Sequence, residues 1–128
     1  MGLIPALLFL LVSGPQAHAQ DGVTASHQLP AEPGLYRRFD PVRSFGEKHL
    51  VDTLTAVADR LAWVMPHADA LLVGDVSRQG GGWMFGHITH DAGVDADLGL
   101  YTGSGQQPMR GFVNIAPDDL DLAANWTL

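Results

Sequence analysis

Apolar residues recur every three or four positions between Glu47 and Met65, and this spacing predicts an amphipathic helix. Pro66 follows directly and ends the helix, because proline cannot supply the backbone N–H that a further turn requires. Polar side chains occupy most of the remaining helical positions, so we expect the helix to cover a core with one face. The apolar face consists of Leu50, Val51, Leu54, Val57, Ala58, Leu61, Val64 and Met65.

Shorter apolar segments after this helix predict strands. Residues 70–76 form a compact apolar run that is typical of a buried strand. Residues 94–101 alternate between apolar and polar side chains, which predicts a strand with Asp95 and Asp97 on the same side, away from the core. Residues 110–115 are a plausible third strand.

The two ends of the chain complete the predicted fold. Residues 20–44 are polar and contain several prolines and glycines, which predicts an extended lead-in with little regular structure. Near the other end, Pro117 opens a predicted last helix that continues to Leu128, with Asp118 as its cap. The pattern therefore predicts an α+β fold, a small antiparallel sheet with helices on one side.

The first residues have the layout of a secretory signal peptide. A short apolar run extends from Leu3 to Val12 and is broken by Ser13-Gly14-Pro15, and Ala17-His18-Ala19 provides a small-residue cleavage site. We predict residues 1–19 as a signal peptide and Gln20 as the first mature residue. The run is too short to span a bilayer, and the alternative is a buried amino-terminal helix, since no lysine or arginine precedes the run.

Composition narrows the possible functions. The 128 residues are 46% hydrophobic and 16% charged, which suits one globular domain. The formal net charge of −7 argues against a nucleic-acid partner, because a basic surface is missing. The chain contains no cysteine, so disulfides, thiolate metal sites and cysteine nucleophiles are excluded.

Candidate chemistry is concentrated after a run of three glycines at residues 80–82. His87 and His90 lie three positions apart, and Asp97 follows seven positions after the second histidine. Imidazole and carboxylate are ligands that zinc accepts, and a loop that carries histidines toward an aspartate on a strand is a workable metal geometry. Asp95, on the same side of the strand, could orient a ligand. The alternative is an exposed polar loop beside a solvated strand face.

Segment 86–98 resembles the penicillin-insensitive murein endopeptidases. These belong to a group of zinc peptidases that also contains D-Ala-D-Ala carboxypeptidases and dipeptidases. The first motif of the group is a small hydroxyl residue, a histidine, a glycine three residues later and an aspartate seven residues later. Thr89, His90, Gly93 and Asp97 fill these places.

Two further residues favour the endopeptidases within this group. Dipeptidases usually carry alanine at the position of Asp95, whereas the endopeptidases carry aspartate there and an additional upstream histidine, here His87. The resemblance extends from Phe45 to Tyr101, about half of the chain.

The resemblance implies a zinc centre with His90 and Asp97 as ligands and His87 as a further metal ligand. It also implies hydrolysis of cross-links between peptidoglycan stem peptides in the periplasm. The family completes its site with a histidine-x-histidine motif far downstream, but no histidine follows His90. We therefore interpret residues 45–128 as the amino-terminal part of a zinc D,D-peptidase-like domain whose catalytic residues are expected beyond Leu128.

Two other functions remain open. One is a D-Ala-D-Ala carboxypeptidase or dipeptidase, for which Asp95 is the discordant residue. The other is a non-catalytic metal-binding module of the cell wall. All three functions have peptidoglycan as the expected partner, and none requires nucleic acid or a membrane span. The oligomeric state is not predicted.

Overall fold

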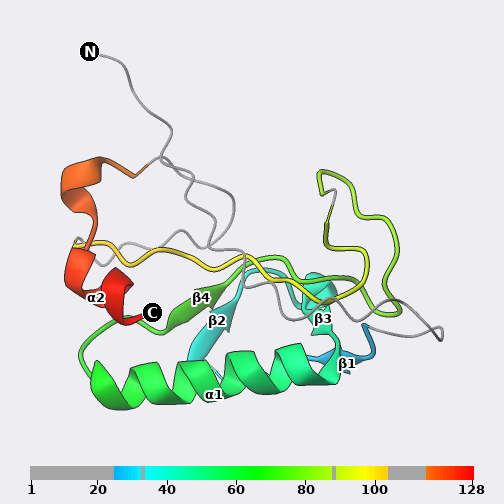
Figure 1. Cartoon of the computed structure of the whole chain (residues 1–128), viewed down its shortest axis with the longest axis horizontal. Helices are drawn as coiled ribbons and strands as arrows, with labels where there is room; N and C mark the ends of the chain where they lie inside the picture. Colours follow the sequence, from blue (N-terminus) through cyan, green and yellow to red (C-terminus); the bar gives the residue numbers. More distant parts are fainter. Residues whose placement is uncertain (1–24, 33, 88, 104–114) are drawn as a thin grey trace.

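The computed structural model describes residues 25–32, 34–87, 89–103 and 115–128, and these residues form an α+β fold as predicted (Figure 1). The predicted signal peptide and all but the last residue of the predicted strand at 110–115 lie outside the described residues. None of the described helices is long and apolar enough to cross a membrane. The elements in chain order are β1 (His27–Gln28), β2 (Tyr36–Arg38), a 3-10 turn (Pro41–Arg43), β3 (Phe45–Gly46), α1 (Lys48–Val64), β4 (Leu71–Val73), a second 3-10 turn (Pro117–Asp119) and α2 (Leu122–Thr127).

Helix α1 confirms the prediction made from the apolar spacing. It begins and ends within one residue of the predicted bounds, and the N–H of Met65 closes it by donating to the carbonyl of Leu61 at 2.8 Å. Pro66 prevents a further turn. Its buried residues all belong to the predicted stripe, and they are Leu50, Val51, Leu54, Ala58 and Leu61.

The strands form two pairs with different directions. β1 and β3 are antiparallel, with Gln28 opposite Phe45, although neither was predicted as a strand from the sequence. β2 and β4 are parallel, with Tyr36 opposite Leu71 and Arg38 opposite Val73. A parallel pair needs a long crossover connection, and α1 lies within the connection from β2 to β4.

The prediction for residues 20–44 missed regular structure. This segment contains β1, β2 and the turn Pro41–Arg43. Tyr36 is almost fully buried in the core, and its hydroxyl donates to the carbonyl of Pro30 at 2.8 Å. The alternation of apolar and polar residues that predicts a strand is not visible in this segment, because β2 is only three residues long.

The predicted regular strand at 94–101 is wrong. The predicted alternation is correct, since apolar and acidic side chains of this segment lie on different sides. The segment makes a single bridge, between Leu98 and Val73. Ala96 lies in the core and Leu98 packs against it, as the alternation predicts. Asp95 and Asp97 are also buried, so the polar side of the segment faces protein and not solvent.

The predicted single helix from Pro117 to Leu128 is also wrong. Leu120 is extended between a 3-10 turn and α2, and the cap of α2 is Asp121, whose side chain accepts from the N–H of Ala124. The side chain of Asn125 holds α2 against the core by hydrogen bonds to both backbone groups of Tyr101, at 2.9 and 2.7 Å.

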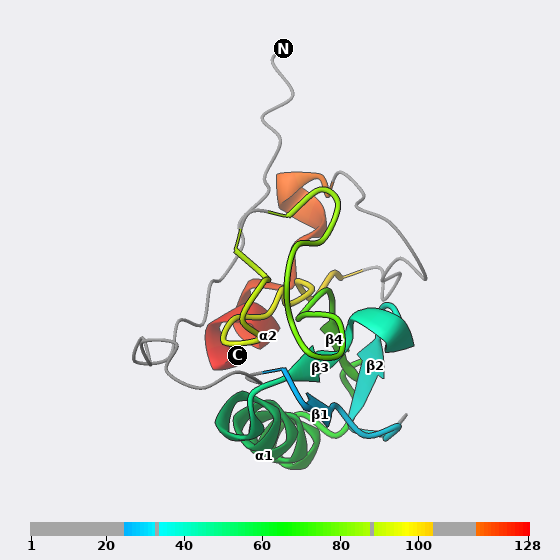
Figure 2. The same cartoon turned by 90° about the vertical axis from the view of Figure 1, so that its right-hand side faces the viewer.

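The arrangement separates the main helix from the histidine-bearing segment. α1 runs along one side of the strand pairs, and residues 78–87 and 89–93 project from the opposite side (Figure 1). The perpendicular view shows the same separation, with α1 below β1 and the loop above (Figure 2). The apolar core between α1 and the strands thus supports a polar site on the far side.

Candidate metal centre

A tight turn at Gly93 brings His90 and Asp97 toward each other. Gly93 has a φ of +69°, a conformation that side-chain-bearing residues rarely adopt. A Cβ atom at this position would lie 2.8 Å from the Cβ of Ala25 and 3.0 Å from the Cα of Gly46. The glycine of the motif is therefore needed twice, for its backbone conformation and for its close packing.

Asp97 is fixed by backbone hydrogen bonds to the end of β4. The N–H of Gly74 donates to the carbonyl of Asp97 at 2.7 Å, and the N–H of Asp97 donates to the carbonyl of Asp75 at 3.0 Å. A Cβ atom on Gly74 would lie 2.8 Å from the Cβ of Asp97. The absence of a side chain at Gly74 lets the aspartate approach the strand.

The structure brings together the three residues predicted as metal ligands. His87, His90 and Asp97 each offer one ligand atom, and these atoms all lie within 4.8 Å of one another. The rings of His87 and His90 have centroids 4.7 Å apart and are tilted by 59°. His90 and Asp97 are buried and His87 is partly buried. The alternative of an exposed polar loop does not describe these side chains, while their role as ligands remains a prediction.

His90 lies between two buried carboxylates. Its Nε2 is 3.2 Å from Asp97 Oδ1, and its Nδ1 is 3.2 Å from Asp95 Oδ2. Burial lowers the pKa of His90, but the carboxylates of Asp97 and Asp95 outweigh it, so the net pKa is raised above the usual value of about 6.5. Asp95 occupies the position that the sequence suggested for a group that orients a ligand.

His87 is held by a residue that the sequence analysis did not identify as part of the site. Its Nε2 lies 2.7 Å from Asp75 Oδ2, and the same oxygen accepts a hydrogen bond from Arg43 at 2.9 Å. The available signal for Asp75 was an aspartate within the otherwise apolar run 70–76, shortly before the glycine-rich loop. Arg43 carried no such signal, because it lies 32 positions earlier in the chain.

The polar atoms of this group fit a divalent cation. Asp75, Asp95 and Asp97 are all buried. Among the described residues, Oδ1 of Asp75 and Oδ1 of Asp95 have no hydrogen-bond partner, and Oδ2 of Asp95 has only the 3.2 Å approach of His90 Nδ1. Unpaired polar atoms and adjacent buried carboxylates are costly. A cation between His90 and Asp97 would reduce the repulsion, and imidazole and carboxylate match zinc.

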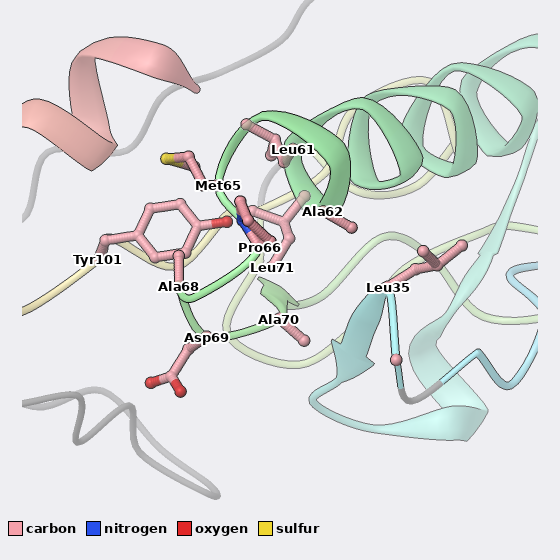
Figure 3. Close-up of a pocket in the computed structure, with 11 residues that line it drawn as sticks. Leu35, Leu61, Ala62, Met65, Pro66, Ala68, Asp69, Ala70, Leu71 and Tyr101 are labelled. Atoms are coloured by element: carbon pink, nitrogen blue, oxygen red, sulfur yellow. The ribbon is translucent and has the colours of Figure 1, made fainter.

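An exposed aromatic pair and a cavity lie outside this group of histidines and aspartates. Trp83 and Phe85, in the loop that leads to His87, are exposed and form an edge-to-face pair with centroids 6.1 Å apart. A cavity of about 190 Å³ lies at the end of α1, and Met65, Asp69 and Tyr101 are among the residues that line it (Figure 3). Its lining includes none of the three predicted ligands.

Comparison with known proteins supports the resemblance of segment 86–98. A family model described as penicillin-insensitive murein endopeptidase matches residues 17–119, which is most of the chain. No curated protein matches the chain. The matched range includes every residue of the candidate centre described above.

Proposed function

We propose that this chain, which belongs to the penicillin-insensitive murein endopeptidase family, binds zinc through His87, His90 and Asp97 and serves the hydrolysis of cross-links between peptidoglycan stem peptides. Membership of the family supports a peptidase that acts on murein. Zinc as the ion, the peptide cross-link as the bond and the periplasm as the location are our proposals.

The observation that carries the proposal is the convergence of three ligand atoms in a largely buried, carboxylate-rich site. Atoms within 4.8 Å of one another are close enough to share one ion after small side-chain movements. The raised pKa of His90 has the same origin, since the carboxylates that stabilise a proton on its ring also stabilise a metal cation beside it.

The residues of the chain have separable roles in this proposal. His90 and Asp97 contribute ligand atoms from the two sides of the Gly93 turn, and His87 contributes one from the preceding loop. Asp95 stabilises the ring of His90 from its Nδ1 side. When bound, zinc supplies a Lewis acid that polarises a peptide carbonyl and activates water for hydrolysis.

Zinc titration tests the metal assignment. We expect the purified chain to bind zinc by calorimetry, and His90→Ala to lose most of this affinity, because the variant removes a ligand from the centre of the group. His49→Ala is the matched control, since His49 is an exposed histidine of α1 that does not belong to the candidate ligand group. Equal zinc affinity in the original chain and in His90→Ala would overturn the assignment.

Peptidoglycan fragments test the reaction. The proposal predicts that the zinc-loaded site, joined to the downstream histidine-x-histidine motif of the family, cleaves cross-linked muropeptide dimers and leaves free D-Ala-D-Ala termini intact. Removal of terminal D-alanine alone would indicate the carboxypeptidase or dipeptidase function. Zinc binding with no turnover of either substrate, even when the chain is joined to the downstream histidine-x-histidine motif of the family, would indicate a non-catalytic metal-binding module.

A further inference from the structure

One residue outside the predicted ligand set contacts two of its three members. Asp75 follows β4, and its side chain reaches His87 while its backbone carbonyl reaches Asp97. The two ligands come from different segments, the glycine-rich loop and the turn after Gly93. Asp75 therefore lies where the positions of these segments are fixed relative to each other.

The side-chain contact restricts the ring of His87. Asp75 is only 4% exposed, and its Oδ2 lies 2.7 Å from His87 Nε2. Arg43 donates to the same oxygen at 2.9 Å, and the carbonyl of Arg43 accepts from the N–H of Val76 at 2.9 Å. The carboxylate is thus held from two directions, and the neutral His87 ring can approach it only by donating a proton from Nε2.

The backbone contact restricts Asp97. The N–H of Asp97 donates to the carbonyl of Asp75, and the N–H of Gly74, the neighbouring residue, donates to the carbonyl of Asp97. Both backbone groups of Asp97 are therefore bound to the end of β4, so a displacement of Asp75 would move the carboxylate ligand as well as the histidine.

We propose that Asp75 is the positioning residue of the metal centre. Its carboxylate fixes His87 as the Nε2–H tautomer, which leaves Nδ1 as the ligand atom, and its backbone carbonyl accepts from Asp97. Ligand histidines in proteins usually donate their other N–H to a carboxylate or carbonyl, which orients the ring and raises its basicity. The inference deepens the proposed zinc site and rests on it, while the orientation of His87 can be measured without metal.

Substitution of Asp75 tests the inference through the tautomer of His87. Nitrogen-15 NMR of the metal-free chain, at mildly alkaline pH where imidazole is neutral, should show a single Nε2–H tautomer with slow exchange of that proton. Asp75→Ala should give mixed tautomers and fast exchange, and Asp75→Asn, which keeps an acceptor of the same shape, should give an intermediate result. Zinc affinity should fall about 10- to 100-fold in the alanine variant and less in the asparagine variant.

Asp91→Ala is the matched control. Asp91 is an exposed aspartate next to His90, so its loss removes one charge near the site without removing the contact to His87. Arg43→Gln is a second route if Asp75→Ala does not fold, because the partly exposed Arg43 can be replaced while Asp75 remains; it should increase the exchange of the His87 proton.

An unchanged His87 tautomer and proton exchange in Asp75→Ala and Arg43→Gln would overturn the inference. So would a loss of zinc affinity in Asp75→Ala no greater than in Asp91→Ala. Failure of the metal assignment gives a different result, because the original chain would then bind no zinc although the His87 tautomer still responds to Asp75.

Discussion

Replacing Gly93 with alanine should disrupt the turn between His90 and Asp97, and the structure sets the size of the effect. The Cβ atom would lie 2.8 Å from the Cβ of Ala25 and 3.0 Å from the Cα of Gly46. Non-bonded carbon atoms prefer separations of about 3.5–4.0 Å, so both contacts are repulsive. The contact with Gly46 involves main chain, which cannot rotate away.

Two terms add to the cost. A residue with a side chain at a positive φ loses about 1–2 kcal/mol relative to glycine. Insertion of a methyl group into a packed position costs a further ~1–3 kcal/mol. The free energy of unfolding should therefore fall by about 2–5 kcal/mol, a large part of the roughly 5–15 kcal/mol that stabilises an ordinary domain.

The variant Gly80→Ala measures the conformational cost without the packing cost. Gly80 has a φ of +80°, but a Cβ atom added there would meet no atom of the described residues within 4 Å beyond its chain neighbours, so its substitution carries the conformational cost alone. Urea unfolding followed by circular dichroism should show that Gly93→Ala is less stable than Gly80→Ala by about 1–3 kcal/mol. Equal losses in the two variants would refute the packing argument, and a loss below about 1 kcal/mol in Gly93→Ala would refute both terms.

Three further predictions concern the residues of the metal centre. Zinc affinity should decrease as the pH is lowered toward and below the raised pKa of His90, by about tenfold per pH unit where the proton must be displaced, as measured by competition titration at a series of pH values; an affinity independent of pH would contradict this. The free energy of unfolding of the metal-free chain should decrease as the pH rises. The raised pKa of His90 in the folded state contributes stability that is fully present below pH ~6.5, and this contribution is lost as the pH rises through the folded-state pKa. Gly74→Ala should weaken zinc binding at least about tenfold, since its Cβ would lie 2.8 Å from the Cβ of Asp97 and must displace this ligand. Zinc affinity unchanged in a folded Gly74→Ala chain would show that Asp97 tolerates the displacement.

The sequence determined the features that depend on short-range spacing. The apolar period from Glu47 to Met65 records which face of a helix is buried, and α1 follows it closely. His87, His90 and Asp97 are near one another in the chain, and one turn at Gly93 brings His90 and Asp97 toward each other. The same local motif was enough to indicate the family.

Features that depend on distant partners required the tertiary structure. β2 has only three residues and shows no period, and its parallel pairing with β4 is made across the whole of α1. The alternation at residues 94–101 correctly put Asp95 and Asp97 on one side. The alternation could not show that this side would be buried against His90. Alternation along a segment separates its two faces, but it carries no information about which part of the chain covers each face.

Asp75 is an example within the candidate metal centre of a residue whose role could not be predicted from the sequence. The sequence predicted the ligands, because a metal ligand is defined by its own donor atom. What orients a ligand is defined by a partner, and here the partners of Asp75 are Arg43, 32 positions earlier, and the loop residue His87. The sequence by itself therefore determined which atoms could bind a metal. Only the folded chain decided which of those atoms face one another, since this depends on hydrogen bonds between segments that are distant in sequence.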